Sequence, residues 1–432
     1  MDLVMQSGVE ALSEAVRSND ARKVREVLTR FPELKASLDD EMVGGHFGAT
    51  PLLTAVNQGN REMVDVLLEA GATINQRSHW WAGSFGVLDT DGDLHDFLIQ
   101  RGARIDAHAA ARLGKLDLLR ELVAKDPAVV HARGGDGQLP LHFAASTEVA
   151  AFLLDQGADI NAIDVDHEST AAQWMVKERS DVARYLVGRG CRTDILLGAA
   201  LGDESVVRTH LAQDAAAIRT VVSDEYFPKK DPRSGGTIYN WTLGTGKDAP
   251  RLAREFGHDH IFRLLMERAP VEQQLAVWCE FADRDEAEAI VARDPSVGGR
   301  LTPADVRKLP DAARDENAAA VSLMLDFGWP VDAKGQHGAT ALHWAAFHGN
   351  LEITRNILRR RPPLEVRDKD FDGTPLFWGI YGSVHGWRCQ TGNYAAVVET
   401  LLAAGATPPP VANGFTASDA VREVLLRGSS GR

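Results

Sequence analysis

The sequence is poor in cysteine, and the cysteines it has are widely spaced. Cys191, Cys279 and Cys389 lie far apart and form no CxxC pair. This spacing excludes a disulfide framework and a cysteine-based zinc cluster, and it is typical of a protein from a reducing compartment. The N-terminal residues also lack a basic segment followed by an apolar one, so no secretory signal is expected.

Positive charge and long apolar runs are also scarce. The chain has 47 Lys and Arg residues against 61 Asp and Glu residues, which gives a formal net charge of −14. An acidic surface repels phosphate, so we expect neither nucleic-acid binding nor attachment to an anionic membrane. No apolar run approaches the length that spans a bilayer. Together these absences predict a soluble, cytoplasmic protein without membrane or nucleic-acid partners.

Signatures of catalysis and cofactor binding are missing as well. The sequence contains no HExxH, no GxSxG and no GxGxxG after a predicted strand. The fragment Gly244-Thr245-Gly246-Lys247 lacks the first glycine of a phosphate loop, and Asp248 stands where that loop has Ser or Thr. His258-Asp259-His260 offers metal-binding side chains, but no further ligands are spaced to complete a site. We therefore expect no cofactor and no metal.

The chain is organised around a repeated helical unit, which is clearest at residues 337–370. That segment reads HGATALHWAAFHGNLEITRNILRRRPPLEVRDKD. Gly338 permits a tight turn, Thr340 is a suitable helix N-cap, and Gly349-Asn350 ends the first helix. Pro362-Pro363 stops the second helix. The apolar spacing between these signals predicts two short helices with a finger-like loop on each side.

The same unit returns along nearly the whole chain. Thr340-Ala341-Leu342-His343-Trp344-Ala345 resembles the Thr-Pro-Leu-His-x-Ala signature of ankyrin repeats. Related segments are Gly48-Ala49-Thr50-Pro51-Leu52, Gln138 to Ala145 and Asp372-Gly373-Thr374-Pro375-Leu376. The period of roughly 30–35 residues corresponds to about a dozen units. The resemblance implies an all-α ankyrin-repeat solenoid of stacked helix–turn–helix units with protruding loops or short hairpins.

We expect one continuous solenoid over residues 1–427, because a single repeat cannot bury its own apolar face. Its three parts are an N-terminal cap of two amphipathic helices, the repeats, and a C-terminal cap, at residues 9–40, 46–410 and 411–427. Residues 428–432 are expected to form a disordered tail. The last full repeat carries an insertion, residues 382–393, between its two helices.

Aromatic residues recur in register with the repeats. Four positions after the threonine that opens a unit stand Trp174, Trp241, Trp344 and Trp378, and Phe143 holds the matching place in another unit. The pattern fits either a ladder of binding residues or ordinary packing between helices, and we favour packing. The family resemblance implies that the signature histidines, His142 and His343, bond to the backbone of neighbouring loops.

The loops carry large aromatic and titratable side chains, where small polar residues are usual. Such side chains on one surface suggest recognition, because rings and charged anchors dominate binding hot spots. The candidate binding residues are His46, His79, Trp80, Trp81, Gln336, His337, Phe347, His348, Tyr381, His385 and Trp387. The alternative is that the long loops fold back and bury their rings locally.

Acid–base catalysis would need a carboxylate, histidine or tyrosine held in a cleft. The residues of the right type are Asp166, His167, Glu168, Glu225, Tyr226, His337 and His348. They come from distant repeats, so the sequence leaves their convergence open. We expect an enzyme to bring the loops at 77–89, 162–169, 223–236 and 382–393 over one pocket, whereas splayed loops would contradict an enzyme.

Two functions therefore compete. The resemblance to ankyrin repeats implies a scaffold that binds a protein partner on the concave face lined by its loops. We also expect the chain to be a monomer. The alternative is a small-molecule-binding protein or an acid–base isomerase, lyase or hydrolase. Its pocket would be built from the loops rich in His, Trp, Tyr and carboxylates.

Overall fold

The computed structural model describes residues 3–89, 92–408 and 416–429, and nearly all regular structure in them is helical. Within these ranges the chain forms no β-strand, only isolated antiparallel bridges such as Ile163 with Thr170 and Lys334 with Thr340, at the bases of loops. The prediction of an all-α repeat solenoid is confirmed. Residues 411–415 and 430–432, which belong to the predicted C-terminal cap and tail, lie outside the described residues.

The chain divides into two compact units, Met1–Ile261 and Phe262–Arg432. The helices that begin in the first unit are α1 Leu3–Arg17, α2 Ala21–Arg30, η1 Pro32–Ser37, α3 Pro51–Asn57, α4 Arg61–Glu69, α5 His95–Gln100, α6 Ala107–Arg112, α7 Leu116–Lys125, η2 Pro127–His131, η3 Pro140–Phe143, α8 Thr147–Asp155, α9 Ala171–Met175, α10 Ser180–Gly188, α11 Ile195–Leu201, α12 Glu204–Gln213, η4 Ala215–Arg219, η5 Asn240–Gly244, α13 Ala249–Glu255 and α14 Asp259–Arg268. The prediction of one continuous solenoid stays a prediction.

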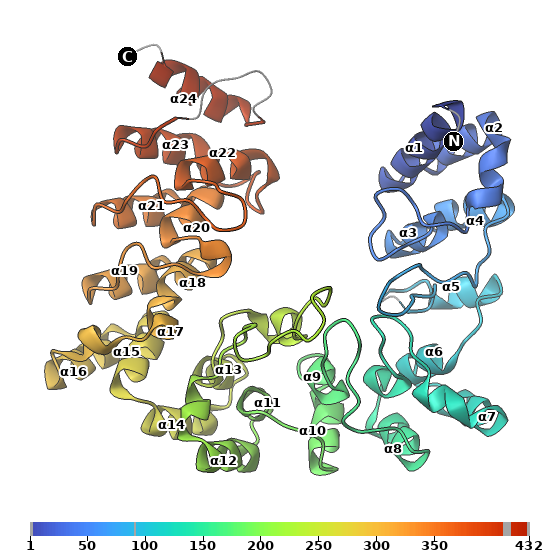
Figure 1. Cartoon of the computed structure of the whole chain (residues 1–432), viewed down its shortest axis with the longest axis horizontal. Coiled ribbons are helices and arrows are strands. Elements are labelled where there is room, and N and C mark those ends of the chain that lie inside the picture. Colours follow the sequence, from blue (N-terminus) through green and yellow to red (C-terminus); the bar gives the residue numbers. More distant parts are fainter. Residues whose placement is uncertain (1–2, 90–91, 409–415, 430–432) are drawn as a thin grey trace. The chain divides into compact units, whose positions relative to one another are not determined.

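The second unit repeats the same arrangement. Its helices are α15 Val271–Glu280, α16 Arg284–Arg293, η6 Val297–Arg300, α17 Pro303–Val306, α18 Lys308–Arg314, α19 Ala318–Asp326, η7 Gln336–Gly338, α20 Ala341–Phe347, α21 Leu351–Leu358, α22 Pro375–His385, α23 Tyr394–Ala403 and α24 Asp419–Ser429. Figure 1 shows α18, α20 and α22 stacked in one column and α19, α21 and α23 in another. We call the first column the inner helices, because the finger-like loops precede them in each repeat.

The repeat at α20 and α21 shows how the sequence sets these elements. Thr340 precedes α20, and its backbone N–H donates to Nδ1 of His343 at 3.0 Å. Gly349 takes the left-handed backbone that ends the helix, with φ of 63°. Asn350 then caps α21 by accepting from the Ile353 amide at 3.0 Å. The helix starts and stops predicted for this repeat are therefore confirmed.

Small residues let the inner helices approach closely. Ala345 and Ala346 of α20 are fully buried, and α20 packs on α18 and α22. A Cβ atom built on Gly382 of α22 would lie only 2.4 Å from the Phe347 carbonyl oxygen. This contact requires glycine, because no other residue leaves the backbone room to approach. Close helix stacking thus depends on the small residues of the repeat pattern.

The N-terminal cap and the signature histidines follow the sequence analysis. Helices α1 and α2 meet at Asp20, whose side chain accepts from the Lys23 amide, although α1 begins earlier than predicted. His142 accepts from the Leu139 amide through Nδ1 and donates from Nε2 to the Ser169 carbonyl at 3.2 Å. His343 makes the equivalent bond to the Gly373 carbonyl, also at 3.2 Å. Both histidines link neighbouring loops.

Two details differ from the expectations. Helix α22 runs to His385, so the first part of the predicted insertion is helical and the connecting loop is residues 386–393. Trp344, Trp378 and Phe143 are buried as the packing interpretation requires, but Trp241 is 71% exposed. Trp241 lies in η5, a π-helical turn that is wound more widely than an α-helix. The side chain four positions after Thr237 therefore does not point into the core. The packing prediction is wrong for Trp241.

Candidate functional site

Two finger loops, one in each unit, share a single local design. Asp164 accepts from the backbone amides of His167 and Ser169 and from the indole of Trp174, whose Nε1 lies 3.2 Å away. Asp368 accepts from the indole of Trp378 at 2.9 Å and also from backbone amides of its own loop. An aspartate that binds successive amides fixes a turn without regular structure. Each loop therefore presents the residues after its aspartate in a defined place.

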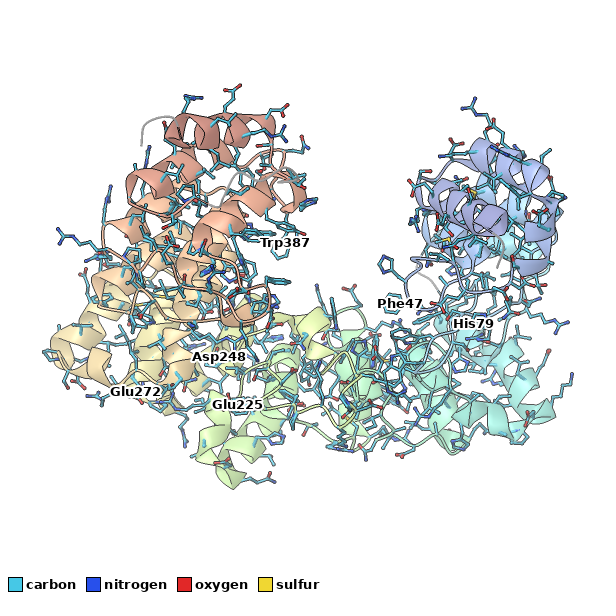
Figure 2. All side chains as sticks on the ribbon, turned by 45° about the horizontal axis from the view of Figure 1, so that its top comes forward. Phe47, His79, Glu225, Asp248, Glu272 and Trp387 are labelled. Atoms are coloured by element: carbon cyan, nitrogen blue, oxygen red, sulfur yellow. The ribbon has the colours of Figure 1, made fainter. Side chains whose placement is uncertain are left out.

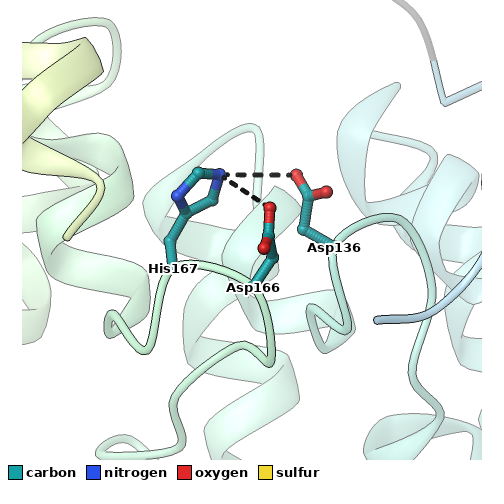
Figure 3. Close-up of side chains that lie close together, drawn as sticks. All are labelled: Asp136, Asp166 and His167. Carbon is teal, nitrogen blue, oxygen red and sulfur yellow. Dashed lines mark ion pairs between the residues drawn. The ribbon is translucent and has the colours of Figure 1, made fainter. Parts of the chain in front are cut away.

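In the first unit this loop meets the preceding one at a carboxylate–histidine cluster, formed by Asp136, Asp166 and His167 (Figure 3). The backbone amides of Val165 and Asp166 both donate to the Asp136 carbonyl at 3.0 Å, which pins the two loops together. Nε2 of His167 lies 3.6 Å from Oδ2 of Asp166 and 3.8 Å from Oδ2 of Asp136. All three side chains are buried.

The cluster is electrostatically costly. Burial raises the pKa of Asp136 to about 6, with Asp166 and Asp164 adding to the rise and His167 opposing it. Burial also raises the pKa of Asp164, despite its hydrogen bonds. When three carboxyl groups lie close together and away from water, the ionisation of one makes the ionisation of the others less favourable. The site thus favours any positive charge that reaches it.

The loop at residues 77–89 folds back on itself beside this cluster. The Ser78 amide donates to the Phe85 carbonyl at 2.8 Å, and Trp80 donates from Nε1 to Oδ1 of Asp136 at 3.1 Å. Trp80 and Trp81 are half-buried as a result. Arg233, from the loop at 223–236, lies over the Trp81 ring at 4.3 Å. The rings of this loop are therefore partly covered, a state between the exposed rings and the locally buried rings of the two alternatives.

The loops at 163–170 and 223–237 enclose a cavity of about 300 Å³. Tyr226 and Glu168 line it, but the Glu168 carboxylate already accepts from the Lys230 and Asp231 amides at 2.8 and 2.9 Å. Glu225 is exposed and is not among the residues lining the cavity. Burial raises the pKa of Tyr226, with Glu225 contributing. Two of the four loops expected to converge for an enzyme therefore share one cavity.

The second unit carries an aromatic patch, which we define as the exposed side chains of Phe371, Phe377, Tyr381, His385 and Trp387. Trp387 is 70% exposed and Phe371 is 64% exposed. Figure 2 shows Trp387 projecting from the loop that follows α22. Tyr381 contacts His385 in a tilted arrangement, with ring centres 4.7 Å apart. Large rings left in water over neighbouring positions typically mark an interaction surface.

The patch rests on a buried floor of rings from the inner helices. Trp387 lies 5.6 Å from Phe347, 5.5 Å from His348 and 6.1 Å from Trp344 between ring centres. Among the described residues, no group hydrogen-bonds to Nε1 of Trp344, although this atom is buried. His348 is buried as well, with the Arg314 backbone beside its ring. Burial lowers the pKa of His348, an effect that Glu316 and the nearby Arg314 backbone oppose only in part.

His337 lies at the edge of the aromatic patch, next to the finger loop that carries Asp370 and Phe371. Its Nδ1 lies 2.7 Å from Oδ2 of Asp370, and its ring centre lies 5.5 Å from that of Phe371. Its backbone carbonyl accepts from the Lys369 amide at 2.7 Å. The structure therefore brings four predicted residues together, because each of their rings contacts the ring of Trp344: His337, Phe347, His348 and Trp387.

The remaining predicted residues are distributed between the units. His46 and His79 are exposed in the first unit, where Nε2 of His79 lies 3.2 Å from the Asp39 carbonyl. Figure 2 shows His79 and Phe47 on adjacent loops. Gln336 is half-buried at the start of η7. Asp166, His167 and His348 are buried, because neighbouring loops or rings cover them.

Sequence reasoning missed Asp136. A signal for it existed, because Asp136 stands six positions before the signature His142, as His337 stands six positions before His343. Aligning the repeats on the signature histidine places Asp136 at a loop tip, next to the loop that carries Asp166 and His167. The catalytic candidates Asp166, His167, Glu168, Glu225 and Tyr226 belong to the first unit, and His337 and His348 belong to the second.

Comparison with known proteins agrees with the repeat architecture. Models of ankyrin-repeat families match residues 47–79, residues 107–196 as three copies, and residues 309–355. Palmitoyltransferase Hip14 of Drosophila melanogaster is 26% identical over 126 residues, or 29% of this chain and 18% of that protein. The transient receptor potential cation channel subfamily A member 1 of the same species is 25% identical over 172 residues, or 38% of this chain and 12% of that protein.

A third relative is the E3 ubiquitin-protein ligase XB3 of Oryza sativa subsp. japonica. It is 35% identical over 81 residues, which is 18% of each chain. The chain thus spans less than a fifth of the length of each of these relatives. Among the described residues, no helix combines the length and apolar character needed to cross a bilayer.

Proposed function

This chain is an ankyrin-repeat protein, and from that premise we propose that it binds a segment of a protein partner through the aromatic patch of the second unit. Ankyrin repeats commonly mediate binding between proteins. The aromatic patch gives this general role a location, since it joins the finger loop of Asp370 to the inner helix α22. Binding on the concave face, as the repeat family implies, would use these same elements.

The observation that carries the proposal is the exposure of Trp387 above the buried indole nitrogen of Trp344. A ring exposed to 70% costs free energy in water and regains it when a partner covers the ring. Among the described residues, Nε1 of Trp344 is buried beside Trp387 without a hydrogen bond. Buried polar groups normally find a partner, so a ligand group that reaches them gains affinity.

These features define the kind of segment that fits. It carries an aromatic or aliphatic anchor that packs on Trp387 and Tyr381, beside a polar group able to accept a hydrogen bond from the Trp344 indole. Aromatic anchors surrounded by water-excluding contacts are typical of binding hot spots. The His337–Asp370 pair at the edge of the patch supplies a polar rim.

A second candidate is a small-molecule ligand in the first unit. The observation that favours it is the cavity of about 300 Å³ between the loops at 163–170 and 223–237. Its lining includes Tyr226 and the half-buried Asp194, whose pKa is raised by burial. Tyr239 donates to Asp194 at 2.9 Å, so this carboxyl is held inside the structure. The volume is at the lower limit of ordinary ligand pockets.

The experiment is a selection of displayed peptides on the intact chain, followed by affinity measurements on variants. We expect Trp387→Ala to weaken the selected peptides by roughly 30-fold or more, the loss expected of a hot-spot residue. The matched control is Trp241→Ala, which removes an equally exposed tryptophan from the first unit. Equal losses in both variants, or no loss in Trp387→Ala, would contradict the proposal.

Three further features belong to this proposal. We place the protein in the cytoplasm as a monomer, with residues 1–427 forming one continuous solenoid. The acidic composition, with a formal net charge of −14, supports a protein partner rather than nucleic acid or an anionic membrane surface.

A further inference from the structure

The geometry points to a divalent metal site at the carboxylate–histidine cluster of the first unit, with Nε2 of His167 and one oxygen each from Asp136 and Asp166 as ligands. The three ligand atoms lie within 4.8 Å of one another. In Figure 3 the imidazole and both carboxylates point at one common place. This inference is independent of the proposed partner surface, which lies in the second unit.

Each proposed ligand is oriented by a bond through its other polar atom. Nδ1 of His167 donates to the Gly236 carbonyl at 2.9 Å, which leaves Nε2 facing the carboxylates. Oδ1 of Asp136 accepts from the Trp80 indole at 3.1 Å, and Oδ1 of Asp166 accepts from the Gly235 amide at 3.0 Å. Metal-binding histidines and carboxylates are usually held in this way by a surrounding set of hydrogen bonds.

The spacing between the ligand atoms fits an ion better than a direct hydrogen bond. Nε2 lies 3.6 and 3.8 Å from the two oxygens, beyond hydrogen-bond distance. Ligands about 2.0–2.2 Å from a tetrahedral ion lie roughly 3.3–3.6 Å apart, so His167 and each carboxylate need only a small movement toward one another.

The donor set selects the class of ion. One imidazole with two carboxylates suits Zn²⁺ and related transition cations, whereas Ca²⁺ requires six to eight oxygen ligands. Three protein ligands leave a fourth position for water. The nearby Asp164 carboxyl adds to the negative potential at the site.

An ion here would fasten neighbouring finger loops to one another. Asp136 comes from one loop and Asp166 and His167 from the next, while Trp80, Gly235 and Gly236 reach the cluster from two others. The equivalent loops of the second unit need no ion, because His337 and Asp370 are in direct hydrogen-bond contact at 2.7 Å. The role we assign to the metal is therefore to hold the loops of the first unit in place.

The test uses the intact chain, stripped with a chelator and titrated with Co²⁺ and Zn²⁺. The visible spectrum of Co²⁺ reports its coordination, and calorimetry gives the affinity for Zn²⁺. We expect one ion per chain at this site, with affinity reduced by about 100-fold or more in Asp166→Asn and His167→Gln. The chain has 14 histidines, so specific binding is read as the difference between wild type and variant.

Two further variants make the result decisive. Asp370→Asn alters the matching loop position of the second unit and should leave metal affinity unchanged. Trp80→Phe keeps an aromatic ring and removes only the bond to Asp136, so affinity should fall roughly 10–100-fold. If the ligand variants fail to fold, Trp80→Phe carries the test, and wild-type affinity there would overturn the assignment. Equal ion uptake by wild type and Asp166→Asn, or an equal loss in Asp370→Asn, would also overturn it.

Discussion

The two units build a finger loop on the same backbone design but carry different side chains at the loop tip. In both, a finger loop is built on an aspartate that accepts from an indole, through Asp164 and Trp174 or Asp368 and Trp378. In both, the loop amide after that aspartate donates to the carbonyl of the preceding loop tip, at 3.0 Å in the first unit and 2.7 Å in the second. The backbone of the contact is therefore shared.

The side chains placed on that backbone differ. The first unit has Asp136 opposite Asp166, buried together with His167. The second unit has His337 opposite Asp370, a complementary pair that remains partly exposed beside Phe371. Repeat architecture fixes where a loop-tip side chain lies, and the residue found there decides what it can bind. The first position favours a cation, and the second borders a surface of rings.

The largest effect should separate the core of the second unit from its aromatic patch. Leu342 is almost fully buried, so Leu342→Ala should leave a cavity and cost about 2–5 kcal/mol of unfolding free energy. Trp387→Ala should change that free energy by less than about 0.5 kcal/mol, because the ring is mostly exposed. Urea denaturation of both variants measures this. A loss in Trp387→Ala as large as that in Leu342→Ala would show that the patch is core.

The signature histidines should make both units sensitive to acid. Burial lowers the pKa of His142 and of His343 to about 4, so each stays neutral in the folded chain while the unfolded side chain titrates near 6.5. Their stabilisation is present above about pH 6.5 and is lost as pH falls toward 4, by at most about 3 kcal/mol for each histidine. Urea denaturation across this range tests it. Constant stability over the range would contradict the assignment.

Asp136 should act in the opposite direction, and only in the first unit. Its pKa, raised by burial to about 6, means that its contribution to stability is present at low pH and is lost as pH rises through 6. Asp136→Asn should therefore stabilise the metal-free chain at pH 7 by up to about 3 kcal/mol and should have little effect near pH 4. A metal-free Asp136→Asn chain less stable than wild type at pH 7 would refute this account of the cluster.

The matched loop aspartates should respond unequally to substitution. The pKa of Asp164 is raised by burial, whereas at Asp368 the bonds from Phe371, Trp378 and other loop groups outweigh burial and lower it. The charged form of Asp368 is thus favoured on folding, and this stability is lost as pH falls. Asp368→Asn should cost about 1.5–3 kcal/mol near pH 7, and Asp164→Asn should cost less. Paired thermal or urea melts decide the order, and a reversed order would contradict the comparison.

The smallest effect is expected at Trp241, the exposed member of the tryptophan series. Trp241→Ala should shift the free energy of unfolding by no more than about 0.5 kcal/mol, since a surface ring contributes little packing. The same measurement on Trp378→Ala should show about 3–5 kcal/mol of destabilisation, because this ring is buried and bonded to Asp368. Similar losses in both variants would mean that Trp241 packs like the others.

Local signals made the fold predictable. Thr340, Gly349 and Asn350 each set a helix start or end through bonds to residues a few positions away. Similar residues recur in the other repeats. The exposed Tyr381 and Trp387 were also predictable, because Tyr381 follows from the repeat register and Trp387 lies in the insertion between the two helices. Burial was harder to predict, because it depends on contacts between loops distant in sequence. His348 is covered by the Trp387 loop, and Asp136 meets residues about thirty positions away.

The most direct test of the central claim is hydrogen–deuterium exchange of the intact chain with and without a selected peptide. The proposal that the aromatic patch is the recognition surface predicts slowed exchange at α20, α22 and the loop at 386–393. Exchange in the loops at 163–170 and 223–237 should stay unchanged. Protection confined to those first-unit loops, with none around Trp387, would contradict the account and would favour the cavity as the binding site.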